Sequence, residues 1–275
     1  MLTGLSVRGG KQVRRWGPGR FLVLFVVVLV SAFLIVPVFI SIIGSFSGYW
    51  GLTMFEKGLT LRWYAYVWEN YSHTIKFSVI IAAATVMIDI LLGVPAAYAL
   101  SKGHSRWSTG LEELLSVPVA IPGIAIALAL IQTHNYLSGS WLFIVVGHVI
   151  FTMPLMLRAV TAALRTAKLA AMEEAAASLG AGRCTRLIRV VVPNVRDAII
   201  AGSLMVLTMS LGEFNLTFFL YTPLTMTMPV GLYESYASLR LEIGSAYTTL
   251  FLLFTLPLMA LIQYLGSEKV EGRGF

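Results

Sequence analysis

Long apolar runs constrain this chain more than any other feature of its sequence. Of its 275 residues, 57% are hydrophobic and only 12% are charged, whereas soluble domains carry about 25% charged residues. Because so few charges cannot coat a globule of this size, the apolar side chains must be buried in lipid. The sequence therefore predicts an integral membrane protein built from transmembrane helices.

Six apolar stretches are long enough to cross a bilayer, since a helix needs roughly 20 residues to span a hydrocarbon core of about 30 Å. Pro118 and Pro122 interrupt the start of the third stretch, and Gly139 leaves a short turn before the fourth, as in an antiparallel helix pair. The first stretch is longer than the core of a secretory signal, so we interpret it as a retained anchor. The stretches are 21–46, 77–100, 115–131, 141–157, 198–220 and 245–265.

Lysine and arginine residues set the expected orientation, because cytoplasmic loops retain positive charge. With the N-terminus inside the cell, 16 of the 20 basic residues lie on the cytoplasmic side. The exceptions are Lys57, Arg62, Lys76 and Arg240. We therefore expect both termini in the cytoplasm, with tails at 1–20 and 266–275, in a multi-pass membrane protein.

The positions of the basic residues and the single cysteine argue against a nucleic-acid site, an intramolecular disulfide and a multi-cysteine metal site. A net charge of +7 is compatible with nucleic-acid binding, but the basic residues lie between apolar stretches, where they set topology. Cys184 alone can form neither an intramolecular disulfide nor a multi-cysteine metal site. We predict no nucleic-acid partner and no metal site.

The basic, alanine-rich segment 158–196 is the largest predicted cytoplasmic loop. Strong helix formers fill 162–179, and Gly180 then provides a helix stop. A second short helix is expected from about Arg183 to Val192, ended by Pro193. Two short helices around a glycine turn could dock a partner protein, or could form an ordinary amphipathic surface loop.

The spacing within this segment favours docking. Glu-Ala-Ala, three residues, Gly, nine residues and then an apolar pair ending in Pro resembles the EAA loop of binding-protein-dependent ABC importer permeases. Val190 and Val192 stand where that family favours Ile and Leu, and both remain apolar. Flanking sequences over roughly 70–265 share the resemblance. The matching positions are Glu174, Ala175, Ala176, Gly180, Val190, Val192 and Pro193.

This resemblance implies a type I importer fold, with an N-terminal helix followed by a permease core at 70–265. It implies as partners two ATP-binding cassette subunits, a second permease subunit and a periplasmic solute-binding protein. The chain has no G-x-x-x-x-G-K-[ST] segment, so ATP and Mg²⁺ should be bound by the ATPase, and this chain should be neither an enzyme nor a cofactor-binding protein. The predicted ATPase-coupling residues are Glu173, Glu174, Ala175, Ala176, Gly180 and Pro193.

Acidic side chains inside predicted spans are candidates for the translocation pathway, because a charge in lipid costs at least about 2.5 kcal/mol and should face protein or water. Asp89 and Glu213 are such residues, with Asn215 and Thr217 as polar neighbours of Glu213. A structural alternative stays open for both acids: Asp89 could pair with a neighbouring helix, and Glu213 could satisfy backbone groups. We interpret His148 as a hydrogen-bonded helix-packing residue.

An outer, proline-bounded segment precedes the last span and, by the resemblance, lies near the docked binding protein. Tyr221, Tyr233, Glu234 and Tyr236 are its candidate contacts. Two segments most resemble permeases for polyamines, 2-aminoethylphosphonate and other phosphonates, or ferric iron. They are Leu61-Arg62-Trp63-Tyr64 before the second span, and Gly-Glu-Phe at 212–214 followed by Phe-Phe-Leu-Tyr-Thr-Pro at 218–223. An ion-coupled secondary transporter is the alternative function, but it would need paired repeats with discontinuous helices, and no second copy is visible.

Overall fold

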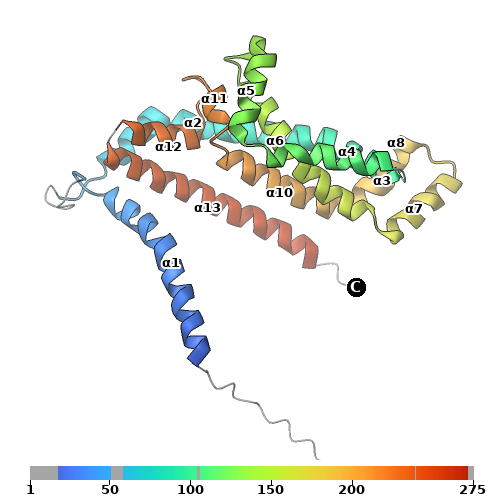
Figure 1. The fold of residues 1–275 in the computed structure, drawn as a ribbon, viewed down its shortest axis with the longest axis horizontal. Helices are drawn as coiled ribbons and strands as arrows, with labels where there is room; N and C mark the ends of the chain where they lie inside the picture. The colour runs from blue at the N-terminus through green and yellow to red at the C-terminus, as the bar shows by residue number, and fades with distance from the viewer. Residues whose placement is uncertain (1–17, 51–57, 104–105, 239, 272–275) are drawn as a thin grey trace, which may run out of the picture.

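The computed structural model describes residues 18–50, 58–103, 106–238 and 240–271 (Figure 1). Within these residues every regular element is a helix, apart from one antiparallel bridge between Ser47 and Leu59. Four helices are long and apolar enough to cross a membrane, or up to six if each of two bent helix pairs counts as one span. The all-α membrane fold predicted from the sequence is confirmed.

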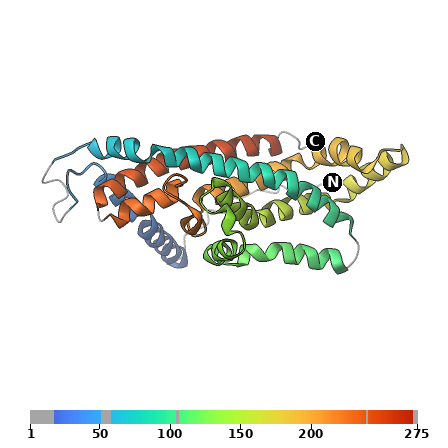
Figure 2. The same ribbon diagram turned by 90° about the horizontal axis from the view of Figure 1, so that it is seen from above.

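Four long segments run side by side along the long axis of the molecule (Figure 2). The first comprises α2 (Arg62–Ile88), the π-helical turn η1 (Asp89–Gly93) and α3 (Val94–Lys102). The others are α6 (Trp141–Leu164), α10 (Arg196–Gly212) and α13 (Leu241–Glu271). One buried apolar cluster joins α3, α6 and α10, centred on Met156 and Val206. Helices α6 and α10 therefore form the centre of the bundle.

Helix α1 (Pro18–Gly44) diverges from the bundle and packs against α13 (Figure 1). Its most apolar window has none of its residues buried inside the chain, although it is the most hydrophobic of the candidate spans. A helix that is apolar all round and unburied requires lipid or another chain around it. The predicted N-terminal membrane helix is therefore present as a separate arm.

The predicted breaks in the spans are partly confirmed. The second span begins at Arg62 and continues to Lys102, so it is longer than the predicted 77–100. In the third, α4 (Arg106–Ser116) and the 3₁₀ turn η2 (Val117–Ala120) are followed by α5 (Gly123–Thr133), and the chain bends by 103° between them. This bend lies at the predicted proline interruption, because Pro122 precedes the first residue of α5.

The fifth predicted span is interrupted as well, so the expectation of one helix over 198–220 is wrong. Helix α10 ends at Gly212, Glu213 is extended, and α11 (Thr217–Leu220) begins after a short turn. The carboxylate of Glu213 accepts hydrogen bonds from the amides of Leu216 and Thr217, at 2.9 to 3.0 Å. These bonds satisfy backbone amides at the start of α11, which would otherwise bond to carbonyls of the preceding turn in a continuous helix.

The two ends of the bundle carry different elements. At one end lie α7 (Ala167–Ser178), α8 (Arg183–Arg186), the π-helical turn η4 (Leu187–Val191) and α9 (Val192–Asn194), and at the other lies α12 (Met228–Ala237) (Figure 1). The 3₁₀ turn η3 (Asn135–Leu137) joins α5 to α6. Most of the predicted tail 1–20, the end of the tail at 266–275, and Lys57 lie outside the described residues, whereas α13 extends past its predicted end to Glu271.

Candidate functional site

The segment that resembles the EAA loop forms a helix, a tight turn and a second helix at one end of the bundle. Helix α7 closes with two hydrogen bonds, from the amide of Ala181 to the carbonyl of Ala176 and from the amide of Gly180 to the carbonyl of Ala177. This pair of bonds defines a Schellman motif, which requires a left-handed residue just past the helix. Gly180 supplies it with φ of 84°. The predicted glycine stop is confirmed.

The second helix of the segment differs from its prediction at Pro193. Helix α8, η4 and α9 run without interruption from Arg183 to Asn194, so Pro193 lies inside this run and does not end it. A bend of 75° then leads into α10. The π-helical turn before Pro193 widens the backbone where a proline ring would otherwise meet the carbonyl of the preceding turn.

The two adjacent glutamates of α7 have opposite environments. Glu173 is buried, with 4% of its surface exposed. Glu174 is exposed, and among the described residues its carboxylate has no hydrogen bond or ion pair, although its backbone carbonyl accepts a hydrogen bond from Ser178. Ala175 is exposed and Ala176 is half-buried. Of the predicted coupling residues, Glu174 and Ala175 are therefore available to another protein, and Glu173 faces inward.

The carboxylate of Glu173 joins three elements. Its Oε1 accepts a hydrogen bond from the Tyr98 hydroxyl at 2.5 Å, and its Oε2 lies 2.5 Å from Nζ of Lys102. Arg186 on α8 completes the cluster, 3.6 Å from Oε1. Burial by itself would raise the pKa of Glu173, but the hydrogen bonds from Lys102 and Tyr98 and the charges of Lys102 and Arg186 hold that pKa below its ordinary value. Glu173 is thus an ionised, internally paired carboxylate.

A groove of about 630 Å³ lies beside this cluster. Three cationic and two carboxylate side chains contribute to its walls, together with small alanines. Small residues allow another backbone to approach closely, and the charges can pair with a complementary surface. The lining residues are Tyr98, Ala99, Lys102, Ala170, Glu173, Glu174, Arg183 and Arg186.

Exposed apolar side chains surround the same turn. Leu179 is 89% exposed, Ile188 66% and Met172 39%. Lipid is not expected to cover apolar side chains at the charged end of a membrane protein. Exposed apolar side chains rimmed by polar groups are typical of a protein interaction site. The helix-turn-helix thus combines a rigid turn, a charged groove and an uncovered apolar patch.

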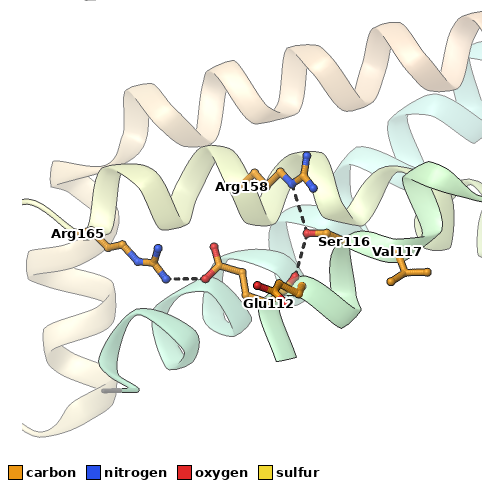
Figure 3. Close-up of a pocket in the computed structure, with 6 residues that line it drawn as sticks. Glu112, Ser116, Val117, Arg158 and Arg165 are labelled. Atoms are coloured by element: carbon orange, nitrogen blue, oxygen red, sulfur yellow. Dashed lines mark hydrogen bonds and ion pairs between the residues drawn. The ribbon is translucent and has the colours of Figure 1, made fainter. Parts of the chain in front are cut away.

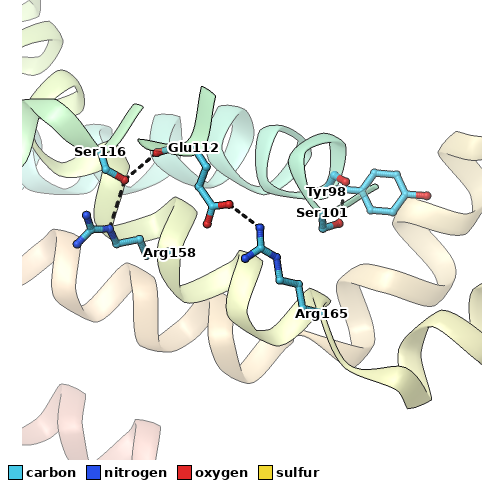
Figure 4. Close-up of polar contacts among 6 residues, drawn as sticks. All are labelled: Tyr98, Ser101, Glu112, Ser116, Arg158 and Arg165. Atoms are coloured by element: carbon cyan, nitrogen blue, oxygen red, sulfur yellow. Dashed lines mark hydrogen bonds and ion pairs between the residues drawn. The ribbon is translucent and has the colours of Figure 1, made fainter. Parts of the chain in front are cut away.

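A second polar contact region fixes α4 to α6 near the same end. Arg165 donates to Oε2 of Glu112 at 2.5 Å, and Arg158 donates to the Ser116 hydroxyl at 3.3 Å, across a pocket of about 450 Å³ (Figure 3). Ser116 in turn donates to the carbonyl of Glu112. Figure 4 shows that this pair of contacts lies apart from Tyr98 and Ser101. The broken third span is therefore attached to α6 by side chains.

Asp89 begins the π-helical turn η1 and is fully buried. Its Oδ2 accepts a hydrogen bond from Thr152 of α6 at 2.7 Å, whereas its Oδ1 has no hydrogen-bond partner among the described residues. This contact with α6 is the pairing that the structural alternative anticipated. A pathway role for Asp89 stays a prediction.

Glu213, Thr217, His148 and Ser210 form one buried polar chain across α10, α11 and α6. Thr217 donates to Glu213 at 3.1 Å and contacts Nε2 of His148 at 2.8 Å, and Nδ1 of His148 contacts Ser210 at 2.7 Å. The packing role predicted for His148 is confirmed. Glu213 accepts hydrogen bonds from backbone amides, as its structural alternative required. Asn215 is exposed. A pathway role for Glu213, Asn215 and Thr217 stays a prediction.

The candidate binding-protein contacts gather at the opposite end of the bundle. The Tyr221 hydroxyl donates to Glu234 of α12 at 2.5 Å, and this hydrogen bond, together with burial, raises the pKa of Tyr221 to about 12. Tyr233 is 47% exposed. Tyr236 contacts Thr248 of α13 through its hydroxyl at 3.2 Å. The structure therefore brings Tyr221 and Glu234 together, while Tyr233 and Tyr236 occupy other positions on α12.

Sequence reasoning did not identify Tyr98, Lys102 and Arg186 as partners of Glu173, nor the contacts of α4 with α6. Tyr98 and Lys102 are four residues apart, a spacing that places both on one face of a helix. That signal was available in the sequence, but it does not reveal which distant carboxylate they face.

Comparisons with known proteins agree with this architecture. Residues 89–269 match the family described as binding-protein-dependent transport system inner membrane component. The spermidine/putrescine transport system permease protein PotC of Shigella flexneri is 26% identical over 256 residues, covering 89% of this chain and 94% of that protein. The putative 2-aminoethylphosphonate transport system permease protein PhnV of Salmonella paratyphi A is 25% identical over 251 residues, covering 88% and 92%.

Solved structures show the same fold at lower identity. A chain of a bacterial ABC transporter involved in the import of the acidic polysaccharide alginate has a TM-score of 0.70 and 14% identity, covering 90% of this chain and 94% of that one. A bacterial alginate ABC transporter in complex with an alginate pentasaccharide-bound periplasmic protein also has a TM-score of 0.70, with 16% identity over 89% and 92% of the two chains. With its family match extending from η1 to the end of α13, this chain belongs to the binding-protein-dependent transport system inner membrane components, the permease subunits of ABC importers.

Proposed function

We propose that this permease passes a small polar solute, delivered by a periplasmic binding protein, across a bacterial inner membrane by ATP-driven alternating access. The observation that carries the proposal is the helix-turn-helix at α7 and α8, whose rigid turn presents Leu179 and Glu174 with no partner from the same chain among the described residues. A separate ATP-binding cassette subunit would cover them. ATP can shift an inward/outward equilibrium only through contacts that differ between the two states. The free energy of ATP binding and hydrolysis would therefore be transmitted to the permease through this surface.

The assembly that follows contains two ATPase subunits, which bind ATP and Mg²⁺, and a second permease subunit, identical or homologous. Both termini and α7 would face the cytoplasm, and α12 would face the periplasm beside the binding protein. The broken helices α4–α5 and α10–α11 support a moving pathway, because interrupted backbone at membrane depth is tolerated beside protein or a water-filled cavity. Asp89, Glu213, Asn215 and Thr217 remain the residues proposed to contribute to it.

For the substrate we propose an ammonium-bearing solute, with a polyamine first and 2-aminoethylphosphonate second; phosphonates without an amine are a further class to be tested. The support is that one relative is named for spermidine and putrescine and another for 2-aminoethylphosphonate, and all three molecules carry a primary amine. Ferric iron is another substrate class to be tested alongside them.

Reconstitution tests the proposed function directly. The permease is co-purified with the ATPase and binding protein encoded beside it, placed in liposomes, and offered labelled spermidine, putrescine, 2-aminoethylphosphonate or ferric iron. We expect uptake of one of them only with ATP and the binding protein together. Uptake by the permease alone along an ion gradient would instead show a secondary transporter and would overturn the proposal.

Substitutions at the docking surface refine this test. Glu174→Lys, Gly180→Asp and Leu179→Asp should leave the protein inserted but reduce ATPase co-purification and ATP-dependent uptake. Leu224→Asp is a matched control for ATPase retention alone, because Leu224 is 80% exposed but lies after α11, near the opposite end of the bundle, in the segment expected beside the binding protein. Equal ATPase retention and uptake in all of the α7 variants and in wild type would contradict the coupling role.

A further inference from the structure

The Glu173 cluster is a polar connection between the docking helix and the second span. Helix α7 follows α6 after a connection of only two residues, so any displacement of α7 reaches α6 through the backbone. Its packing is mainly against α8 and η4, and its Leu169 shares a buried apolar cluster with Val94 and Ala97 of α3. The polar contact with α3, the end of the second span, comes through the carboxylate of Glu173 and its partners Tyr98 and Lys102.

The chemistry of this connection favours a stiff joint. Both carboxylate oxygens are used, one by the Tyr98 hydroxyl and one by the Lys102 ammonium, each at 2.5 Å. Lys102 also lies over the ring of Tyr98, with Nζ 5.6 Å from its centroid, which holds the two α3 side chains in one arrangement. Charge-assisted hydrogen bonds to a buried carboxylate are stronger and more directional than exposed ion pairs.

We propose that Glu173 is a positioning residue that makes α7 and α3 move as one body, so that displacement of the docking helix reaches the second span as well as the fourth. The inference rests on the proposed function, because it assumes that an ATPase displaces α7. It assigns different roles to the two neighbouring glutamates, since Glu174 faces the partner and Glu173 faces the membrane helices. The second span carries Asp89 at the start of η1, the turn that leads into α3, so the joint would connect ATPase movement to the middle of the membrane.

A distance measurement between the second span, next to α3, and α7 tests the joint without knowledge of the cargo. In a Cys184→Ser background, spin labels are attached to Leu92→Cys, in η1 two residues before α3, and to Lys168→Cys in α7, since both native side chains are exposed. The labelled permease, in complex with its ATPase subunits, is compared without nucleotide and with ATP plus vanadate. We expect one narrow distance distribution that is the same in both states.

Removing the carboxylate charge should release the joint. In Glu173→Gln we expect a broader distribution, and a distance that changes when ATP and vanadate are added. Tyr98→Phe should act in the same direction, and combining it with Glu173→Gln should add little, because both remove the same connection. Reversing the ion pair, with Glu173→Lys and Lys102→Glu together in an Arg186→Gln background that removes the neighbouring cation, should narrow the distribution again, which a general folding defect would not allow.

Glu174→Gln is the matched control, because it removes an adjacent carboxylate from the same helix. It should leave the distance between the two labels narrow and reduce ATPase co-purification, whereas Glu173→Gln should retain the ATPase. A narrow, nucleotide-independent distance in Glu173→Gln would overturn the inference, as would a nucleotide-dependent change in the otherwise wild-type chain. Failure of the wild-type permease to retain any ATPase would instead count against the proposed function, so the two failures are distinguishable.

Discussion

At the scale of single residues, the direction in which a side chain faces decides its role more than its identity does. Glu173 and Glu174 are adjacent carboxylates on one helix, yet one is buried among three partners and the other is exposed. The repeat of the α-helix places neighbouring residues about 100° apart, so both could not face the same surface. The sequence identified both as coupling residues, but only the position of α3 reveals that Glu173 faces inward.

Gly180 permits a prediction at this scale, because its φ of 84° disfavours any residue with a Cβ atom, even though no atom lies within 4 Å of an added Cβ. Gly180→Ala should therefore destabilise the end of α7 by about 1 kcal/mol through backbone strain alone. A free-energy change of that size raises the population of the opened turn about fivefold. We expect the amides of Gly180 and Ala181, whose hydrogen bonds close the turn, to exchange with deuterium correspondingly faster.

Two variants separate backbone strain from side-chain volume at this turn. Gly182→Ala adds the same methyl group to open space, but Gly182 has φ of −66°, so the exchange of these amides should not change. Gly180→Asn should lie between wild type and Gly180→Ala, since asparagine adopts the left-handed region more readily than alanine. Equal exchange rates in Gly180→Ala and Gly182→Ala would show that the Schellman turn does not limit the opening of this segment.

At the scale of helices, close packing of α6 against its neighbours depends on small residues that accommodate Met156. A Cβ atom at Gly202 of α10 would lie 2.9 Å from Sδ of Met156, and one at Gly93 would lie 2.9 Å from its Cγ. Small residues at such contacts let membrane helices approach each other. Gly202→Ala should therefore destabilise the protein by about 1 to 3 kcal/mol through overpacking, and thermal unfolding in detergent measures it.

A double substitution tests whether Met156 is the cause. Met156→Ala alone should destabilise, because the side chain is fully buried. Combined with Gly202→Ala it should cost less than the sum of the two single changes, since the clash is gone. Gly212→Ala, with no atom within 4 Å of the added Cβ, should leave the unfolding midpoint near that of wild type. Additive costs for Gly202→Ala and Met156→Ala would contradict this account.

The limits of prediction from sequence also appear at the scale of helices. Apolar length and proline positions predicted the presence, though not the bounds, of the second to fourth spans and the break at Pro122, because burial in lipid and loss of a backbone donor are local properties. The break after Gly212 was anticipated only in the alternative that Glu213 satisfies backbone groups, since it depends on which later amides Glu213 bonds to. The contacts of Glu173 with α3 join residues far apart in sequence, and no local pattern specifies them.

At the scale of the whole molecule, charge and structure divide the two ends of the bundle. The end with α7 and α8 has five arginines and lysines in 165–189, whereas the opposite end presents α12 with Tyr233 and Glu234. Membrane insertion retains positive charge in the cytoplasm. The orientation that follows places α7 inside the cell. It is a prediction about the whole protein, because it depends on the summed charge of one end of the bundle and not on any single residue.

The native cysteine makes this orientation testable without a fusion protein. Cys184 is the only cysteine of the chain and is exposed on α8. In membranes stripped of ATPase, a membrane-impermeant maleimide should label Cys184 in inverted vesicles and leave it unlabelled in intact spheroplasts. In a Cys184→Ser background, Leu224→Cys should give the reverse, because Leu224 is 80% exposed near the other end. Labelling of Cys184 from outside the spheroplast would invert the topology and remove α7 from the reach of any cytoplasmic ATPase.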